Sequence, residues 1–227
     1  MTLEGPEGSG KTTAARHLAE WLRGQGLIVV LTGEPGGTPL GDEVRDIVLH
    51  HRGVADDLDP RADALLFAAQ RAQHVARRIR PALEGGEWVV CARYLDSSLA
   101  YQGTGYGIDE DEMRRLQGFA TGGLMPDLTI LIDVPVEVGL QRKRHGKWNR
   151  FEDTAGVGFF ETVRRAYLEL AADEPDRFRV IDGSGSVADV DATIQALVEP
   201  LLLATAPESQ RPRSRRAVRG PPSGGPS

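Results

Sequence analysis

"GPEGSGKTT", residues 5 to 13, follows a short apolar run and opens an amphipathic segment. The stretch matches G-x-x-x-x-G-K-[ST] at every defined position, so a chance glycine-rich turn is the weaker interpretation. Gly5, Gly8 and Gly10 let backbone N–H groups surround a polyphosphate at the positive end of a helix. Lys11 is placed to bridge two phosphates, and the Thr12 hydroxyl to bind Mg²⁺. The candidate nucleotide-binding residues are therefore Gly5, Pro6, Glu7, Gly8, Ser9, Gly10, Lys11, Thr12 and Thr13.

Apolar runs alternate with helix-period segments along residues 1–204, which is typical of a parallel sheet covered by helices. The expected strands are 1–4, 27–32, 87–92, 127–133 and 178–182. The expected helices are 11–24, 40–51, 60–83, 109–121, 135–144, 156–173 and 187–203. We therefore expect an α/β fold of the P-loop NTPase class, a three-layer α/β/α domain with a five-stranded parallel sheet, surrounding helices and a short lid.

The charge of the chain is unevenly distributed, although the net charge is only −6. Residues 205–227 hold five arginines and one acid, which leaves 22 basic and 32 acidic residues in 1–204. An acidic body argues against nucleic-acid binding. No stretch approaches the ~20 apolar residues that a membrane helix needs. The tail, 205–227, is rich in Pro, Arg, Gly and Ser and lacks apolar residues that could pack, so we expect it to be disordered.

Cysteine and histidine usage excludes two further classes. The single cysteine, Cys91, cannot form an internal disulfide framework and fits a reducing cytosol. The five histidines show none of the Cys/His spacing of structural zinc sites. The sequence therefore predicts a cytoplasmic protein without structural zinc.

Three classes of P-loop protein can be compared on the remaining motifs. A GTPase needs a guanine-reading N-K-x-D, which is absent, and "DTAG" at 153–156 is a weak match out of context. A motor-type ATPase would carry acids at the end of an early hydrophobic strand, whereas strand 87–92 ends in Ala92 and Arg93. A kinase of a small acceptor needs arginines converging on two phosphate groups. Such arginines are present: Arg71, Arg93, and Arg142, Arg144 and Arg150 in or beside "QRKRHGKWNRFED".

Five segments together carry a more specific signal than the P-loop alone: "EGPEGSGKTT", "LTGEPGGTPLGDEVRDIVL", "ALLFAAQRAQHV", "RYLDSSLAYQGTGYGID" and "PDLTILIDVPVEVGLQR". In these segments the chain resembles the thymidylate kinase family over essentially residues 1–204. Glu7 in the P-loop and the arginines of the lid, about 142–153, resemble the bacterial form. The resemblance implies a nucleoside monophosphate kinase that phosphorylates dTMP to dTDP with ATP and Mg²⁺, in dTTP biosynthesis. It also implies a homodimer, which the long apolar helix around 60–75 favours weakly.

The resemblance also implies roles for individual residues. Lys11, Arg93, Arg150 and Glu7 would act in phosphoryl transfer, with Arg144 as a further candidate. On the acceptor side, Phe67 would stack on thymine, and Arg71, one helical turn away, would bind its carbonyl edge. Arg93 would bind the acceptor phosphate, and Glu7 would accept a hydrogen bond from the 3′-hydroxyl. The remaining implied contacts are Glu34, Ser98, Tyr101 and Gln102 for dTMP, Arg142 for adenine and Thr12 for Mg²⁺.

Two positions depart from the family pattern. The family usually has Asp-Arg where this chain has Ala92-Arg93, and Thr-Arg-Glu-Pro where this chain has Thr32-Gly33-Glu34-Pro35. Glu34 and Asp96 are nearby carboxylates that could compensate in part. Two alternatives therefore stay open beside the dTMP kinase: a kinase of a modified deoxynucleoside monophosphate, and a weakly active nucleotide-binding homologue.

Overall fold

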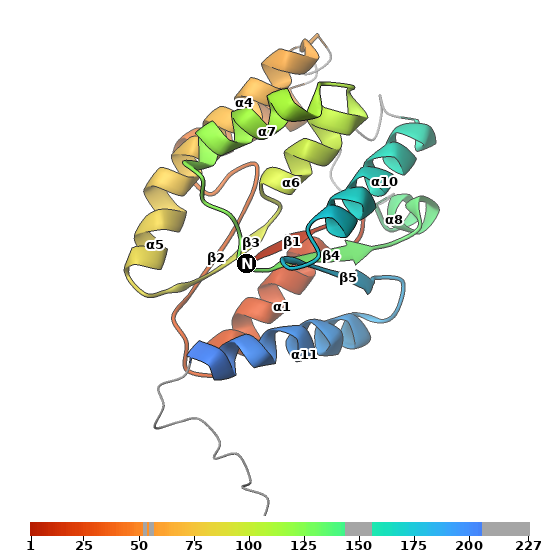
Figure 1. The fold of residues 1–227 in the computed structure, drawn as a ribbon. Helices are drawn as coiled ribbons and strands as arrows, with labels where there is room; N and C mark the ends of the chain where they lie inside the picture. The colour runs from red at the N-terminus through yellow and green to blue at the C-terminus, as the bar shows by residue number, and fades with distance from the viewer. Residues whose placement is uncertain (52–53, 55–56, 144–155, 206–227) are drawn as a thin grey trace, which may run out of the picture.

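The sheet has five parallel strands in the order β2-β3-β1-β4-β5, with β2 and β5 at the edges and β1 in the centre (Figure 1). The computed structural model describes residues 1–51, 54, 57–143 and 156–205. The strands are β1 (Thr2–Glu4), β2 (Val29–Gly33), β3 (Trp88–Ala92), β4 (Thr129–Asp133) and β5 (Phe178–Asp182). The three-residue β1 lies in the middle, paired with both β3 and β4. The carboxyl ends of β1, β2 and β3 meet at one edge of the sheet, where the P-loop begins.

Helices cover both faces of this sheet (Figure 1). They are α1 (Lys11–Gly24), α2 (Pro39–Arg45), η1 (Asp46–His50), α4 (Pro60–His74), η2 (Val75–Ile79), α5 (Arg80–Glu84), α6 (Leu95–Ser98), η3 (Leu99–Gly105), α7 (Glu110–Thr121), α8 (Val136–Lys143), α10 (Val157–Asp173) and α11 (Val187–Thr205). Helices α1 and α11 lie on one face, and α4, α7 and α10 on the other. The result is the three-layer α/β/α arrangement expected from the sequence.

Two apolar cores result from the alternation of side chains along the strands. In β4, Ile130 and Ile132 face one way and pack with Leu18 of α1 and Val198 of α11. Leu131 faces the other way and joins the core formed by α4, α7 and α10. Successive side chains of a strand point to opposite faces, so a run of buried apolar residues marks a strand covered on both sides.

Most helix boundaries agree with the sequence pattern. Asp109 caps α7 because its carboxylate accepts the Glu112 N–H at 3.0 Å, and Gly122 ends the helix with φ 58°. The expected helix 60–83 is a helical run of three pieces, because η2 inserts π-type turns between α4 and α5. Likewise, α2 continues into η1 across the expected helix 40–51.

The segment after β3 is helical, although no helix was expected from the sequence between strand 87–92 and helix 109–121. Residues 95–105 form α6 and η3, and every side chain from Leu95 to Gln102 is buried. Its serines, glycines and tyrosines have poor helix propensity. Packing of this segment against α7 and α10 overrides that preference.

The described residues contain no helix long and apolar enough to cross a membrane. Among the same residues, no group of three or more His, Cys, Asp or Glu side chains is arranged to hold a metal ion. The expected disordered tail, 205–227, lies outside the described residues except for Thr205, which ends α11, and most of the expected lid also lies outside them.

Candidate active site

The P-loop runs from the end of β1 into α1, and its shape depends on glycine. Gly10 precedes the first helical residue with φ 93°, and Gly8 has φ 74°, a region that L side chains rarely adopt. A Cβ at Gly8 would also collide with the backbone of Gly139 in α8. The loop therefore lies directly against α8 and ends where α1 begins, the end of a helix that favours bound anions.

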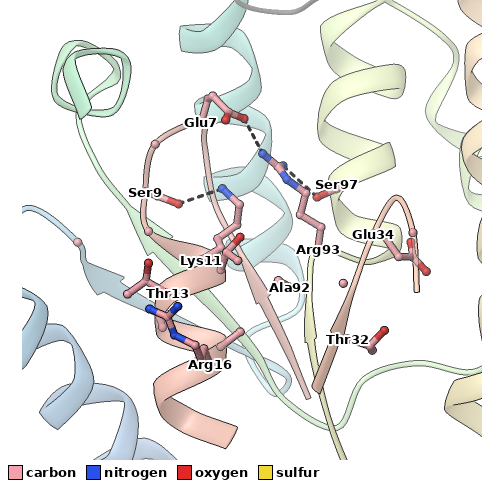
Figure 2. A pocket seen from close by; sticks show the side chains of 18 of the residues that line it. Glu7, Ser9, Lys11, Thr13, Arg16, Thr32, Glu34, Ala92, Arg93 and Ser97 are labelled. Atoms are coloured by element: carbon pink, nitrogen blue, oxygen red, sulfur yellow. Dashed lines mark hydrogen bonds and ion pairs between the residues drawn. The ribbon is translucent and has the colours of Figure 1, made fainter. Parts of the chain in front are cut away.

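Lys11 occupies the centre of this loop (Figure 2). Its Nζ donates hydrogen bonds to Gly5 O at 2.9 Å, Pro6 O at 2.7 Å and Ser9 Oγ at 3.1 Å. Burial, reinforced by the nearby charge of Arg93, lowers the pKa of Lys11 to about 7. A phosphate group bound in the loop would supply the negative charge that favours the ammonium form.

Arg93 follows β3 and has a left-handed backbone, with φ 66°. An arginine there costs of order 1–3 kcal/mol and persists only when the surrounding structure enforces it. The guanidinium points into the cleft, where Nη2 donates to Glu7 Oε2 at 2.7 Å, and it lies 5.1 Å from the centre of the Tyr101 ring (Figure 2). The strained turn thus presents one cation to the P-loop.

Glu7 pairs with two basic groups at the mouth of the loop and feels the charge of a third, Lys11. Besides Arg93, its carboxylate pairs with Lys143 Nζ at 2.9 Å, at the end of α8. Burial would raise the pKa of Glu7, but the charges of Arg93, Lys11 and Lys143 outweigh it and lower the pKa to about 2. Glu7 is therefore a carboxylate at neutral pH and pairs with both Arg93 and Lys143.

A cavity of about 1070 Å³ opens above these residues. It extends from the P-loop to the helices α4 and η3 on one side and to the loop after β5 on the other. The predicted site residues in its wall are Glu7, Gly8, Ser9, Gly10, Lys11, Thr12, Thr13, Glu34, Phe67, Arg93, Tyr101, Gln102 and Arg142. One cavity thus contacts most of the residues predicted to bind ATP or dTMP.

Four predicted residues lie behind this wall. Gly5 and Pro6, the first two residues of the P-loop, are buried and do not line the cavity. Arg71 and Ser98 are each fully buried, and neither is among the residues that line the cavity. Arg71 donates instead to Glu34 Oε2 at 2.7 Å, to Ser98 Oγ and Tyr94 O, each at 2.9 Å, and to Gln117 Oε1. In this structure Arg71 therefore supports the pocket wall from behind.

Glu34 and Asp96 are already engaged, which bears on the missing carboxylate at position 92. Glu34 Oε1 also contacts His74 Nδ1 at 2.8 Å, so both of its oxygens are occupied. Asp96 is fully buried and accepts two hydrogen bonds of 2.8 Å from Arg177. The expectation that Asp96 compensates for Ala92 is therefore wrong, because its carboxylate is directed to Arg177.

The two departures from the family pattern are neighbours. Gly33 and Ala92 are paired in register at the ends of β2 and β3, and both line the cavity. Figure 2 shows Ala92 between the P-loop side of the cleft and Glu34. Small side chains at both positions leave this part of the cleft floor without a carboxylate.

Arg142, at the end of α8, reaches the loop after β5. Its guanidinium donates to Gly183 O at 2.9 Å and to Ser184 O at 3.3 Å. Arg144, Arg150 and the rest of the expected lid lie outside the described residues.

Several residues in or next to the site were not predicted from the sequence, among them Lys143, Arg45 and Glu4. Lys143 lies in the basic stretch that was predicted as a lid, but its partner Glu7 could not be inferred from spacing. Arg45 of α2 lines the cavity and donates to Pro35 O at 2.8 Å. Glu4, directly before Gly5, is a fully buried carboxylate in β1, and an acid in a central strand was the available signal.

Comparison with known proteins gives one consistent family. The family model described as thymidylate kinase matches residues 3–194. A thymidylate kinase of Bifidobacterium longum (strain DJO10A) is 50% identical over 202 residues, covering 88% of this chain and 97% of the relative. One of Pseudomonas syringae pv. syringae is 47% identical over 203 residues, covering 89% and 95%. The crystal structure of thymidylate kinase from Ehrlichia chaffeensis is 32% identical with a TM-score of 0.70, covering 87% and 96%. The chain, with its complete P-loop and its cleft arginine, belongs to the thymidylate kinase family.

Proposed function

We propose that this protein transfers the γ-phosphoryl group of ATP to dTMP, forming dTDP and ADP. The observation that carries the proposal is the convergence of Lys11, Glu7 and Arg93 at one end of a single cavity. Lys11 comes from the donor loop and Arg93 from the wall that leads to Phe67. A cation that touches both halves of a cleft is suited to hold two phosphate groups in line.

On the donor side, the P-loop amides and Lys11 would bind the β- and γ-phosphates of ATP. The Thr12 hydroxyl is exposed in the first turn of α1 and lines the cavity, so it fits a Mg²⁺ ion that takes its other ligands from phosphate and water. Mg²⁺ would neutralise phosphate charge. Arg142 would contact adenine from the end of α8, and Arg150 would complete the charge around the transferred group.

On the acceptor side, Phe67 and Tyr101 offer two aromatic faces in the cavity wall. We propose that Phe67 stacks on thymine and that Tyr101 packs against the sugar. Gln102 and Glu34 would provide hydrogen bonds. Arg71 and Ser98 would act from behind them, by fixing Glu34 and the start of η3.

A panel of nucleoside monophosphates tests the acceptor directly. We would measure ADP release with dTMP, dUMP, ribothymidine 5′-monophosphate, dCMP, dGMP and dAMP, each with ATP and Mg²⁺. The expected result is the highest kcat/KM with dTMP. A higher value with another acceptor would contradict dTMP as the substrate, and no turnover with any of them would contradict the proposed kinase activity.

The single cysteine, buried Cys91, fits a cytoplasmic location for this reaction.

Restoring a carboxylate at position 92 is expected to increase turnover. Ala92 lines the cleft beside Arg93 and also packs against the core under α1, so an aspartate there would have the cations of the cleft on one side to offset its burial. We expect kcat of Ala92→Asp with dTMP to rise roughly tenfold, about 1.4 kcal/mol of barrier, with KM for dTMP little changed. Ala92→Asn, equal in size but uncharged, is the matched control and should show no gain. An equal rise of kcat in both variants, or a fall of kcat in Ala92→Asp, would show that the missing negative charge does not limit turnover.

We also propose a homodimer that forms through α4 and α7. These helices pack together, and each carries a large exposed apolar side chain, Leu65 at 57% and Phe119 at 87% exposure. Phe119→Lys is expected to shift the protein from dimer to monomer in light scattering at micromolar concentration. Ile28→Lys, at another exposed apolar position, is the control and should leave the mass unchanged. A monomeric wild type would contradict the proposal.

A further inference from the structure

Glu4 is a buried carboxylate with three donors and no contact with the cavity. It ends β1 and is fully buried. Oε1 accepts the Tyr94 N–H at 2.6 Å. Oε2 accepts the Ser97 hydroxyl at 2.7 Å and the Tyr167 hydroxyl at 2.9 Å. A carboxylate in this position is costly unless it is hydrogen-bonded, so these three contacts are what makes its burial possible.

All three donors connect Glu4 to the region of Arg93. The Arg93 N–H donates to Leu3 O at 3.0 Å, and the next N–H, that of Tyr94, donates to Glu4. The end of β1 therefore binds the peptide groups on both sides of the Arg93 Cα, the residue whose φ is 66°. Two fixed peptide planes leave the chain between them little freedom to relax to negative φ.

A second connection runs through a side chain. Ser97 donates to Glu4 and in turn accepts a hydrogen bond of 3.3 Å from Arg93 Nη1. Tyr167 of α10 contacts both Ser97 Oγ at 2.8 Å and Glu4. The guanidinium is thus held by Glu7 on its cleft side and by the Ser97 group on its inner side.

We propose that Glu4 is a positioning residue for phosphoryl transfer. Its carboxylate fixes the left-handed turn at Arg93 and, through Ser97, the direction of the guanidinium. The inference rests on the proposed function, because it assumes that Arg93 contacts the phosphates. A displacement of about 1 Å at such a group can cost roughly 100-fold in rate.

The charge around Glu4 makes a neutral replacement practicable. Burial and the nearby Asp96 raise the pKa of Glu4 to about 7, while Ser97, Arg93 and Tyr167 act in the opposite direction. Asp96 is itself paired with Arg177. Since neither form of Glu4 is strongly favoured near neutrality, glutamine at this position should be tolerated by the fold.

The test compares Glu4→Met, Glu4→Gln and Thr2→Val. Methionine keeps the volume but removes every acceptor, whereas glutamine keeps an oxygen for the Tyr94 N–H. Thr2→Val deletes a different buried hydrogen bond of the same strand, that between Thr2 Oγ1 and Thr129 Oγ1 at 2.9 Å. We expect kcat to fall about 100-fold in Glu4→Met, and we expect the kcat of Glu4→Gln to be about tenfold higher than that of Glu4→Met. KM for ATP should stay within about threefold, because the P-loop is untouched, and Thr2→Val should keep wild-type kcat.

The proposal is overturned if Glu4→Met is folded and its kcat equals that of Thr2→Val. It is also overturned if the kcat of Glu4→Gln is no higher than that of Glu4→Met. If Glu4→Met does not fold, Tyr167→Phe removes only the hydroxyl that contacts Glu4 and Ser97. A several-fold loss of kcat without a change of KM for ATP would then support the proposal, and unchanged kcat would overturn it. Absence of dTDP formation by the wild type would instead show that the proposed function has failed.

Discussion

Lys11→Ala is expected to lower kcat for dTDP formation by roughly a thousandfold, the upper end for one electrostatic group in a transition state. Lys11 is the only described cation whose ammonium is held inside the P-loop, by Gly5 O, Pro6 O and Ser9 Oγ. Its loss removes positive charge where the phosphates of ATP would lie. The measurement is coupled ADP release with saturating dTMP, with circular dichroism to establish that the variant is folded.

Arg23→Ala provides the control for Lys11. Arg23 lies in the last turn of the same helix, α1, and donates to Val29 O at 2.8 Å, away from the cleft. This variant should lose some stability, about 1 kcal/mol for one hydrogen bond, and keep its turnover. If Lys11→Ala instead turned over at the wild-type rate, the P-loop would not be the donor site and the proposed kinase reaction would be untenable.

Arg93→Gly is expected to lower kcat by a similar factor while keeping or raising stability. The lost guanidinium bridges the P-loop and the acceptor side of the cleft, and charge-stabilising arginines in phosphoryl transfer are worth about 10³ or more. Glycine, however, accepts a φ of 66° without the steric cost that arginine incurs there. Chemical denaturation and coupled ADP release, carried out on the same preparation, separate the two effects.

Arg93→Ala is the matched variant because it deletes the same guanidinium but retains a Cβ. Its kcat should equal that of Arg93→Gly, and its free energy of unfolding should be lower by about 1 kcal/mol, the cost of a left-handed L residue. An alanine variant more stable than the glycine variant would show that the backbone at this position is not left-handed in solution.

The parts predictable from sequence are those that depend on neighbours along the chain. The glycine and lysine spacing of the P-loop specifies a local backbone shape and a helix start at Lys11, both of which the structure has. Strand 178–182 coincides with β5, because a short apolar run between polar segments has few alternatives in an α/β chain. The family resemblance was predicted from the same local motifs and is confirmed by the comparisons.

The parts not predictable depend on contacts between distant segments. Glu4 and Tyr94 are 90 positions apart, and Glu4 and Tyr167 are 163 apart, so no local pattern joins them. The helical turns of α6 and η3 form from residues with low helix propensity because α7 and α10 bury them. Propensity is a weak prior that tertiary packing overrides in this segment.

Depth within the site is equally hard to predict. Phe67 and Arg71 share one face of α4, as their spacing predicts, yet Phe67 lines the cavity and Arg71 lies behind it. The spacing of two residues along a helix specifies which face they share. It does not specify whether a side chain lines the cavity or lies behind the cavity wall. The bond from Arg71 to Glu34 decides that position, and Glu34 follows a different strand.

The pairing of Gly33 with Ala92 constrains the order in which this chain could evolve toward the family pattern. A Cβ at Gly33 would lie 3.0 Å from Ala92 O, so an arginine introduced there first would crowd the strand and add a cation to a cleft that already holds Lys11 and Arg93. An aspartate introduced first at position 92 would already find cations in the cleft. The effect of the arginine thus depends on which residue occupies position 92, a case of sign epistasis. We therefore expect aspartate at position 92 to increase activity by itself, and arginine at position 33 to do so only when that aspartate is already present.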